Sequence, residues 1–283
     1  MTPASSARRD ATALRAACPG AFAAPWPVRL RRLLGWTAFA ALFAWCLYDF
    51  GFSPARLWTG FQRFGEIASF MFPPVIWRSW EAFAPVLAAL GETIAMAFMG
   101  TVLGSLLAFP ASFLGARTIN RFPLLRLTAR RGYDIVRAFE TLILALIFIR
   151  AFGLGPLAGI LAIAVSDFGV QAKLFSEALE NVSEKPVEGV VASGAGRAQA
   201  IRFAILPQVM PVFVSLVLYS FESNVRSSTI LGIVGAGGIG FILSDLIAAY
   251  HWGEAWSVIL LIVVMVYVID LASARLRSRL IDG

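Results

Sequence analysis

The sequence predicts an all-α integral membrane protein with about six transmembrane helices and both termini in the cytoplasm. Composition is the first reason, because 59% of the 283 residues are hydrophobic and only 14% are charged, against about 45–50% and about 25% in soluble domains. A mean hydropathy of +0.77 likewise excludes a disordered chain and almost every soluble fold. The third reason is that the basic residues lie between long apolar runs, where they set membrane topology.

Six apolar runs approach the length of about 20 residues that a helix needs to cross the hydrocarbon core. In chain order they are 33–48, 93–116 (with a start near residue 88), 133–152, 156–170, 203–221 and 255–269. Three arginines precede the first run, but no small-residue cleavage site follows it, so we expect an uncleaved anchor. A short turn, 153–156, joins the third and fourth runs, and a glycine-rich stretch, 230–242, separates the last two.

The positions of arginine and lysine orient these spans. With the N-terminus inside, four cytoplasmic segments hold 18 of the 24 basic residues and the external segments hold four, in agreement with the positive-inside rule. The predicted organisation is a basic cytoplasmic tail (1–32), a first transmembrane anchor (33–50), a periplasmic or interfacial segment (51–87), a transmembrane core (88–274) that includes a cytoplasmic loop (171–206), and a cytoplasmic C-terminus (275–283).

Several classes of function are excluded. The isoelectric point near 10.1 does not indicate nucleic-acid binding, because the basic residues are dispersed between membrane segments instead of clustering on a solvated face. His251 is the only histidine, and Cys18 and Cys46 have no metal-ligand spacing. No Gly-x-x-x-x-Gly-Lys-Ser/Thr loop occurs, so we expect no ATP hydrolysis by this chain. No catalytic site, metal site or cofactor is predicted.

The cytoplasmic loop 171–206 has the features of a functional loop, since loops of this length inside a compact domain are seldom idle. Pro186 suits the first turn of a short helix, with Glu188 in the same turn. The stretch 193–196, Ser-Gly-Ala-Gly, is expected to break that helix before a second one, 197–205, leads to Leu206 and Pro207. A solvated linker is the alternative interpretation.

Within this loop, Glu188-Gly189-Val190, three residues, Gly194, nine residues and Ala204-Ile205-Leu206-Pro207 resemble the cytoplasmic loop of ABC-importer permeases. The pattern of that family is Glu-Ala-Ala, three residues, Gly, nine residues and Ile-x-Leu-Pro. Four residues match it, and the three that depart, Gly189, Val190 and Ala204, are small or apolar. The downstream segment 221–240 is similar to the phosphonate-transport subgroup, and the similarity covers about residues 92–274.

The resemblance implies a type I ABC importer permease in the bacterial inner (plasma) membrane. The loop 171–206, which we call the coupling loop, would dock on a separate ATP-binding subunit that uses the ATP. Its expected contact residues are Glu188, Gly189, Gly194, Leu206 and Pro207. The resemblance also implies a periplasmic phosphonate-binding protein and a permease homodimer in the lipid bilayer. Phosphite, phosphate or another oxyanion is the alternative substrate. An ion-coupled secondary transporter is disfavoured, because it would need matching broken helices in two halves.

Charged residues within the spans are candidates for the translocation path, because each costs about 2.5–3.5 kcal/mol to insert. Arg137 and Glu140 are three residues apart and Glu222 and Arg226 are four apart, spacings that place each pair on one helix face. Internal ion pairing is therefore one interpretation. In the other, Arg137 or Arg226 attracts an anionic phosphonate, and the neighbouring hydrogen-bond donors are Asn224, Ser227 and Ser228.

The glycine-rich stretch contains Gly235-x-Gly237-x-x-Gly240, which formally matches a dinucleotide-binding pattern. A membrane span precedes it where a nucleotide site requires a strand, so we reject that function. Gly237 and Gly238 are instead expected in a gate or in the translocation path, because irregular backbone at membrane depth lines cavities. Close packing between helices is the alternative.

Overall fold

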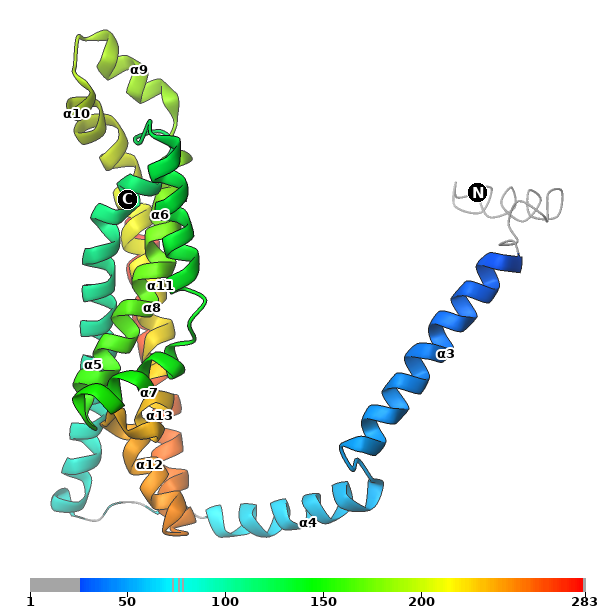
Figure 1. Ribbon diagram of the computed structural model, residues 1–283. Coiled ribbons are helices and arrows are strands. Elements are labelled where there is room, and N and C mark those ends of the chain that lie inside the picture. The colour runs from blue at the N-terminus through cyan, green and yellow to red at the C-terminus, as the bar shows by residue number, and fades with distance from the viewer. Residues whose placement is uncertain (1–25, 73, 76, 78, 282–283) are drawn as a thin grey trace, which may run out of the picture. The chain divides into compact units, whose positions relative to one another are not determined.

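The computed structural model describes residues 26–72, 74–75, 77 and 79–281, and these residues form helices and connecting loops, with no strand among them (Figure 1). Most of the predicted cytoplasmic tail, including Cys18, lies outside the described residues, as does Arg78, one of the external arginines. The chain divides into two compact units, 1–68 and 69–283.

The first unit holds α3, Trp26–Asp49, and nearly all of α4, Pro54–Met71. The 24 residues of α3 are long and apolar enough to cross a membrane, as predicted for the first anchor. In α4, aromatic side chains recur at helical spacing, and Trp58, Phe61 and Phe64 are all exposed. Such an amphipathic helix suits a membrane interface, which remains the prediction for this segment.

The second unit is a helical bundle. Its helices are α5 (Trp80–Gly115), α6 (Pro123–Val136), α7 (Thr141–Phe152), α8 (Pro156–Glu180), α9 (Glu184–Ala192), α10 (Arg197–Ala200), α11 (Leu206–Leu231), α12 (Gly238–Ala248) and α13 (Trp252–Ile281). A π-helical turn, Ile201–Ile205, precedes α11, and a kinked turn, Gly232–Ala236, follows it, with Gly235 at φ of +108°. Figure 1 shows α9 and α10 together at one end of this bundle.

Five helical stretches among the described residues are long and apolar enough to span a membrane, and each covers one of the predicted spans to within one residue. The predicted third span, 133–152, is wrong as a single helix. It is divided between α6 and α7, because Arg137 ends α6 and the backbone of Glu140 is extended, with ψ of 135°. The remaining 12 residues of α7 measure about 18 Å, which is short of the hydrocarbon core of about 30 Å.

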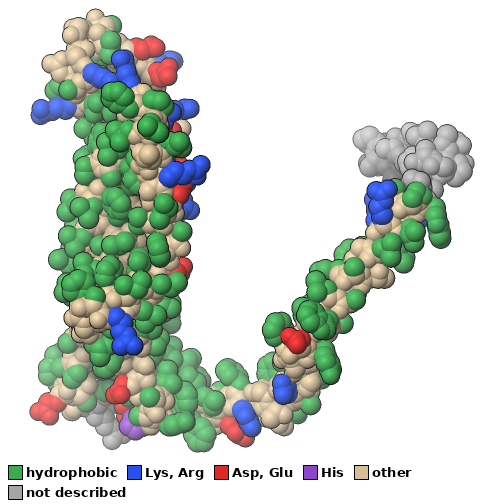
Figure 2. Space-filling model, in the orientation of Figure 1, with side chains coloured by type: hydrophobic (Ala, Val, Ile, Leu, Met, Phe, Trp, Pro, Cys, Tyr) green, Lys and Arg blue, Asp and Glu red, His purple; other side chains and the backbone are tan. Residues whose placement is uncertain are grey.

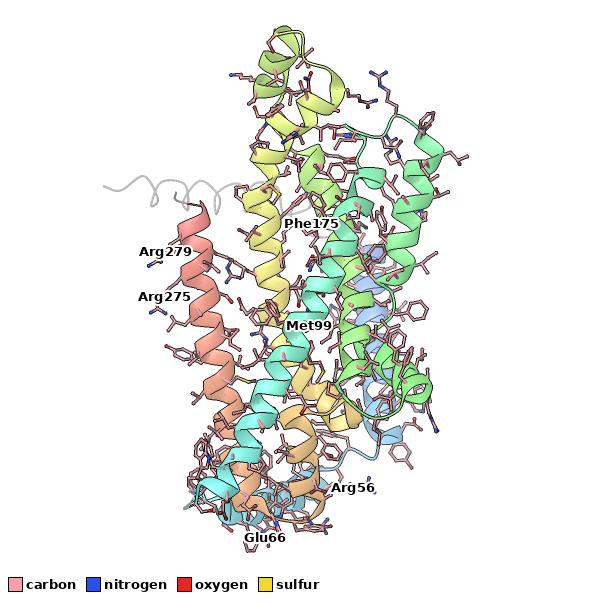
Figure 3. The ribbon with its side chains drawn as sticks, turned by 90° about the vertical axis from the view of Figure 1, so that its left-hand side faces the viewer. Arg56, Glu66, Met99, Phe175, Arg275 and Arg279 are labelled. Atoms are coloured by element: carbon pink, nitrogen blue, oxygen red, sulfur yellow. The ribbon has the colours of Figure 1, made fainter. Side chains whose placement is uncertain are left out.

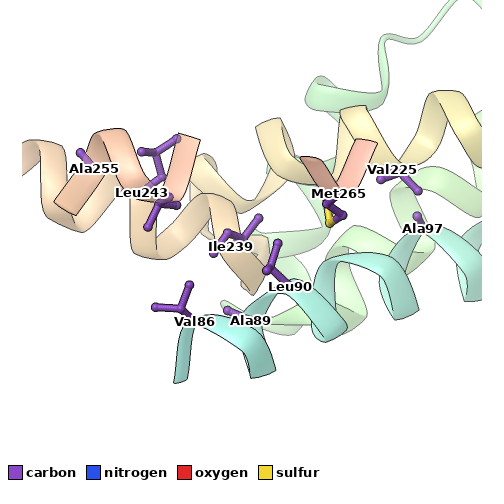
Figure 4. Packing of buried hydrophobic residues seen from close by; sticks show 10 residues of the cluster. Val86, Ala89, Leu90, Ala97, Val225, Ile239, Leu243, Ala255 and Met265 are labelled. Atoms are coloured by element: carbon purple, nitrogen blue, oxygen red, sulfur yellow. The ribbon is translucent and has the colours of Figure 1, made fainter. Parts of the chain in front are cut away.

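Small residues let α5 and α8 approach closely, as is common between membrane helices. A Cβ atom on Gly100 would lie 2.6 Å from the side chain of Ile163, and one on Gly104 would lie 2.8 Å from the carbonyl of Ala164. An apolar cluster packs α5 against α11, α12 and α13 (Figure 4). The bundle core is therefore built around α5.

The surface of the second unit matches a membrane environment. Figure 2 shows hydrophobic side chains over most of its flank, while charged side chains gather mainly over α9, α10 and the neighbouring end of α6. Arg275 and Arg279 are exposed near the end of α13 and point away from the bundle (Figure 3). An apolar flank with charged ends is the pattern that a lipid bilayer selects.

Candidate coupling loop and translocation path

The predicted loop 171–206 begins too early, because residues 171–180 continue helix α8. The rest of the coupling loop folds as two short helices, α9 and α10, separated by a turn at Gly194. Helix α9 begins at Glu184, two residues before Pro186, and carries Glu188 and Gly189, both exposed. Gly194 has φ of +87°, a conformation that glycine adopts at little cost, so the expected break between the helices is confirmed. Helix α9 therefore presents its polar residues to solvent at the end of the bundle.

The coupling loop returns to the bundle at the start of α11. The backbone N–H of Ser183 donates to Gln208 Oε1 at 3.1 Å, and Gln208 Nε2 donates to the carbonyl of Ala204 at 2.8 Å. Leu206 packs on a core cluster, whereas Pro207 is exposed in the first turn of α11. The residue just before α9 is thus hydrogen-bonded to the first turn of α11, which closes the segment that holds α9 and α10.

A buried polar cluster joins α5, α8 and α11. Asn224, which is 8% exposed, donates from Nδ2 to Asp167 Oδ2 at 2.7 Å and to Thr101 Oγ1 at 2.9 Å. Gln171 Nε2 lies 3.3 Å from the same Asp167 oxygen. The side chain of Asn224 is therefore committed to neighbouring helices. Asp167 is not among the predicted path residues, although a carboxylate at the end of a span is a signal that could identify it.

The two serines that follow Asn224 bond within their own helix. Ser227 Oγ donates to the carbonyl of Ser223 at 3.3 Å, and Ser228 Oγ donates to the carbonyl of Asn224 at 2.7 Å. Ser228 is fully buried, while Ser227 is partly exposed. Of the two hydroxyls, that of Ser227 is thus the more accessible.

Four charged side chains form a network between α11 and α13. Arg226 lies 3.1 and 3.2 Å from the two carboxylate oxygens of Asp270 and 3.8 Å from Glu222. Glu222 also pairs with Arg277 at 3.0 Å. The expected pairing of Glu222 with Arg226 is present, and Asp270 and Arg277 were missed because they lie on another helix. The side chain of Arg226 is 45% exposed, so it can also meet a ligand or a partner protein.

Arg137 and Glu140 do not share a helix face. Both are exposed in the break between α6 and α7, and within the described part of the chain no ion pair joins them. The expectation of a paired face is wrong because the helix ends before the second residue of the pair. Their role in the path remains a prediction.

The glycine-rich stretch forms an irregular turn between α11 and α12. Gly237 and Gly238 have φ of +86° and +70°, which side-chain-bearing residues seldom adopt. The next backbone N–H, that of Ile239, donates to Thr93 Oγ1 at 2.8 Å. A Cβ atom on Gly237 would lie 2.8 Å from Glu92 Oε1. The turn therefore combines irregular backbone with close contact to α5. Among the described residues, no group of His, Cys, Asp or Glu could hold a metal ion.

The sequence over residues 100–282 matches the family described as "Binding-protein-dependent transport system inner membrane component". The chain belongs to this family. The fold of this permease agrees, with a TM-score of 0.63 and 24% identity to a chain from inward facing conformations of the MetNI methionine ABC transporter, over 71% of this chain and 99% of that one. It is thus a multi-pass permease of a type I ABC importer in the inner membrane, a class that works with an ATP-binding subunit and a substrate-binding protein.

Several relatives carry names that refer to phosphorus compounds. The putative phosphite transport system permease protein HtxC of Stutzerimonas stutzeri is 36% identical over 84% of this chain and 83% of its own length. The phosphate-import permease protein PhnE of Mycolicibacterium smegmatis is 42% identical over 68% of this chain, which spans 36% of that protein. The putative cryptic phosphonate transport system permease protein PhnE2 of Escherichia coli is 46% identical over 43% of this chain and 99% of its own length.

Proposed function

We propose that this permease carries a phosphonate across the inner membrane, after delivery by a periplasmic binding protein and with energy from a separate ATP-binding subunit. The observation that carries the proposal is the exposed helix α9 with Glu188 and Gly189, held at the end of the bundle by the Gly194 turn. The names of the relatives support a phosphorus oxyanion as substrate. Phosphite, phosphate or another oxyanion is the alternative within the same machinery.

The docking site for the ATP-binding subunit is proposed to be α9 together with the start of α11. The contact residues would be Glu188, Gly189, Gly194, Leu206 and Pro207. An exposed nine-residue helix followed by one tight turn is a surface that a groove on the partner can enclose. Two copies of the permease, each with one such surface, would place two ATP-binding subunits side by side, and we propose a homodimer on this ground.

The translocation path is proposed to run past the charged network between α11 and α13 and past the turn at Gly237 and Gly238. Arg226 is a half-exposed guanidinium two residues after the buried Asn224, so the two side chains lie on nearly opposite faces of α11. A guanidinium binds phosphonate oxygens in a bidentate manner, and here it would exchange Asp270 for the passing anion. Gly237 and Gly238 would allow the backbone at the outer end of α11 to open and close.

Growth of a deletion strain on single phosphorus sources tests the proposal. Loss of growth on an alkylphosphonate alone, restored by the wild-type chain and not by Gly194→Arg, would support both the substrate and the docking loop. The matched control is Gly132→Arg, which adds the same charge on α6 where a Cβ atom meets nothing within 4 Å. Loss of growth on phosphite or phosphate alone would mean that this oxyanion, and not a phosphonate, is the substrate. Restoration of growth by Gly194→Arg would contradict the proposed role of the coupling loop.

A further inference from the structure

Charged side chains form a network where the coupling loop leaves α8. Its members, Glu180, Arg130 and Arg197, are not among the site residues predicted from the sequence. Glu180 is the last residue of α8, and its side chain is only 13% exposed. Its Oε1 atom accepts hydrogen bonds from Arg130 Nη2 at 2.7 Å and from the backbone N–H of Arg117 at 2.6 Å. One carboxylate therefore joins the end of α8 to α6 and to the α5–α6 loop, residues 116–122.

The position of this carboxylate is unfavourable unless it is paired. The C-terminal end of a helix carries partial negative charge, and a charge with little exposure loses hydration. Arg130 compensates for both effects, and its Nε atom also donates to the carbonyl of Gly115, the last residue of α5, at 2.9 Å. A single forked guanidinium, which lysine cannot replace, thus bridges the ends of α5 and α8.

The α5–α6 loop also receives a hydrogen bond from α10, the helix that follows the Gly194 turn. Arg197, the first residue of α10, donates from Nη2 to the carbonyl of Ile119 at 2.5 Å. Thr118 Oγ1 donates to the carbonyl of Leu179, next to Glu180, at 3.0 Å. The residues before α9 and those after the Gly194 turn therefore both form hydrogen bonds with the α5–α6 loop. Helix α9 is connected to that loop on both sides.

We propose that Glu180 is a positioning residue that transmits displacement of α9 to α5 and α6 through Arg130 and the α5–α6 loop. The inference rests on the proposed function, because α9 is displaced only when an ATP-binding subunit docks there. Contiguous contacts of this kind carry coupling between sites when both sites bias one element. Without the carboxylate, α9 moves while α5 stays in place, so ATP is hydrolysed without productive transport.

The test compares Glu180→Gln with Glu177→Gln in the complete importer, reconstituted in proteoliposomes with its ATP-binding subunit and binding protein. Glu177 lies about one turn earlier on α8 and carries the same charge, and the structure of the described residues contains no ion pair to it. Uptake of an alkylphosphonate and hydrolysis of ATP are measured together. We expect Glu180→Gln to lower uptake per ATP hydrolysed by at least about fivefold, the lower range of coupling between sites, while Glu177→Gln behaves as the wild type.

Hydrogen exchange of residues 116–122 provides a second measurement that a purely structural role would not change. In the wild type, this exchange should differ between nucleotide-free and ATP-bound importer, and in Glu180→Gln the difference should disappear. An equal rise in exchange in both states, or a parallel loss of uptake and hydrolysis, would show that Glu180 only holds the fold. An unchanged uptake ratio would also overturn the inference. A wild type that takes up no phosphonate would contradict the proposed substrate, and the exchange comparison would still test Glu180.

Discussion

Substitution of Gly104 by alanine tests the close approach of α5 and α8. A Cβ atom at this position would lie 2.8 Å from the carbonyl oxygen of Ala164, 2.8 Å from Asp167 Cβ and 3.3 Å from the backbone nitrogen of Phe168. Two of these atoms are backbone, and the third is fixed directly to it, so α5 and α8 would have to separate. Overpacking of this kind costs about 1–3 kcal/mol.

At about 3 °C per kcal/mol for a chain of this size, Gly104→Ala should lower the thermal midpoint by about 3–9 °C. The midpoint is measured on detergent-solubilised permease by the loss of the monodisperse peak in size-exclusion chromatography after heating. Gly91→Ala is the control, because Gly91 lies on the same helix and a Cβ atom there meets nothing within 4 Å. Equal midpoints for the wild type and both variants would refute the close packing described here.

Three further substitutions test the candidate sites. Arg226→Gln should lower uptake into proteoliposomes without lowering membrane insertion, and unchanged uptake would exclude the guanidinium from the path. Gly194→Ala should reduce co-purification of the ATP-binding subunit, because φ of +87° costs alanine about 1–2 kcal/mol; retained co-purification would show that the turn is not needed. Asn224→Leu should destabilise the permease by about 1–3 kcal/mol, since Asp167 loses the donor at 2.7 Å, and an unchanged thermal midpoint would contradict this.

The spans that could be predicted are those determined by local properties. Five predicted runs coincide to within one residue with parts of long apolar helices of the structure, because hydropathy over about 20 residues decides membrane insertion. The run 133–152 is wrong as a single helix because α6 ends at Val136, where the chain packs closely on another helix. A Cβ atom on Gly169 of α8 would lie 2.8 Å from the backbone nitrogen of Arg137, so the end of α6 packs against a residue 32 positions away. Periodicity within the run does not contain that information.

The same distinction applies to the candidate sites. The turn at Gly194 and the irregular backbone at Gly237 follow from glycine's own conformational freedom, and both could be predicted. The partners of Arg226 could be predicted only where they share its helix, so Glu222 was found and Asp270 was not. Glu180 was missed for the same reason, because its partners Arg117 and Arg130 lie more than 45 positions away. Short-range spacing identifies pairs within a helix, whereas the tertiary fold decides which helices a carboxylate joins.

Helix α11 connects the two candidate sites physically. It runs from Leu206, at the end of the coupling loop, to Leu231, just before the glycine-rich turn that contains Gly237 and Gly238. Its 26 residues extend over about 39 Å. Asn224 ties this helix to α5 and α8, and Arg226 ties it to α13. A displacement at the Leu206 end of α11 is therefore expected to reach the turn at Gly237 and Gly238 along one continuous helix, and the two polar junctions determine which neighbouring helices move with it. For this reason the charges within the membrane need not contact substrate to affect transport, and uptake must be measured alongside binding when they are substituted.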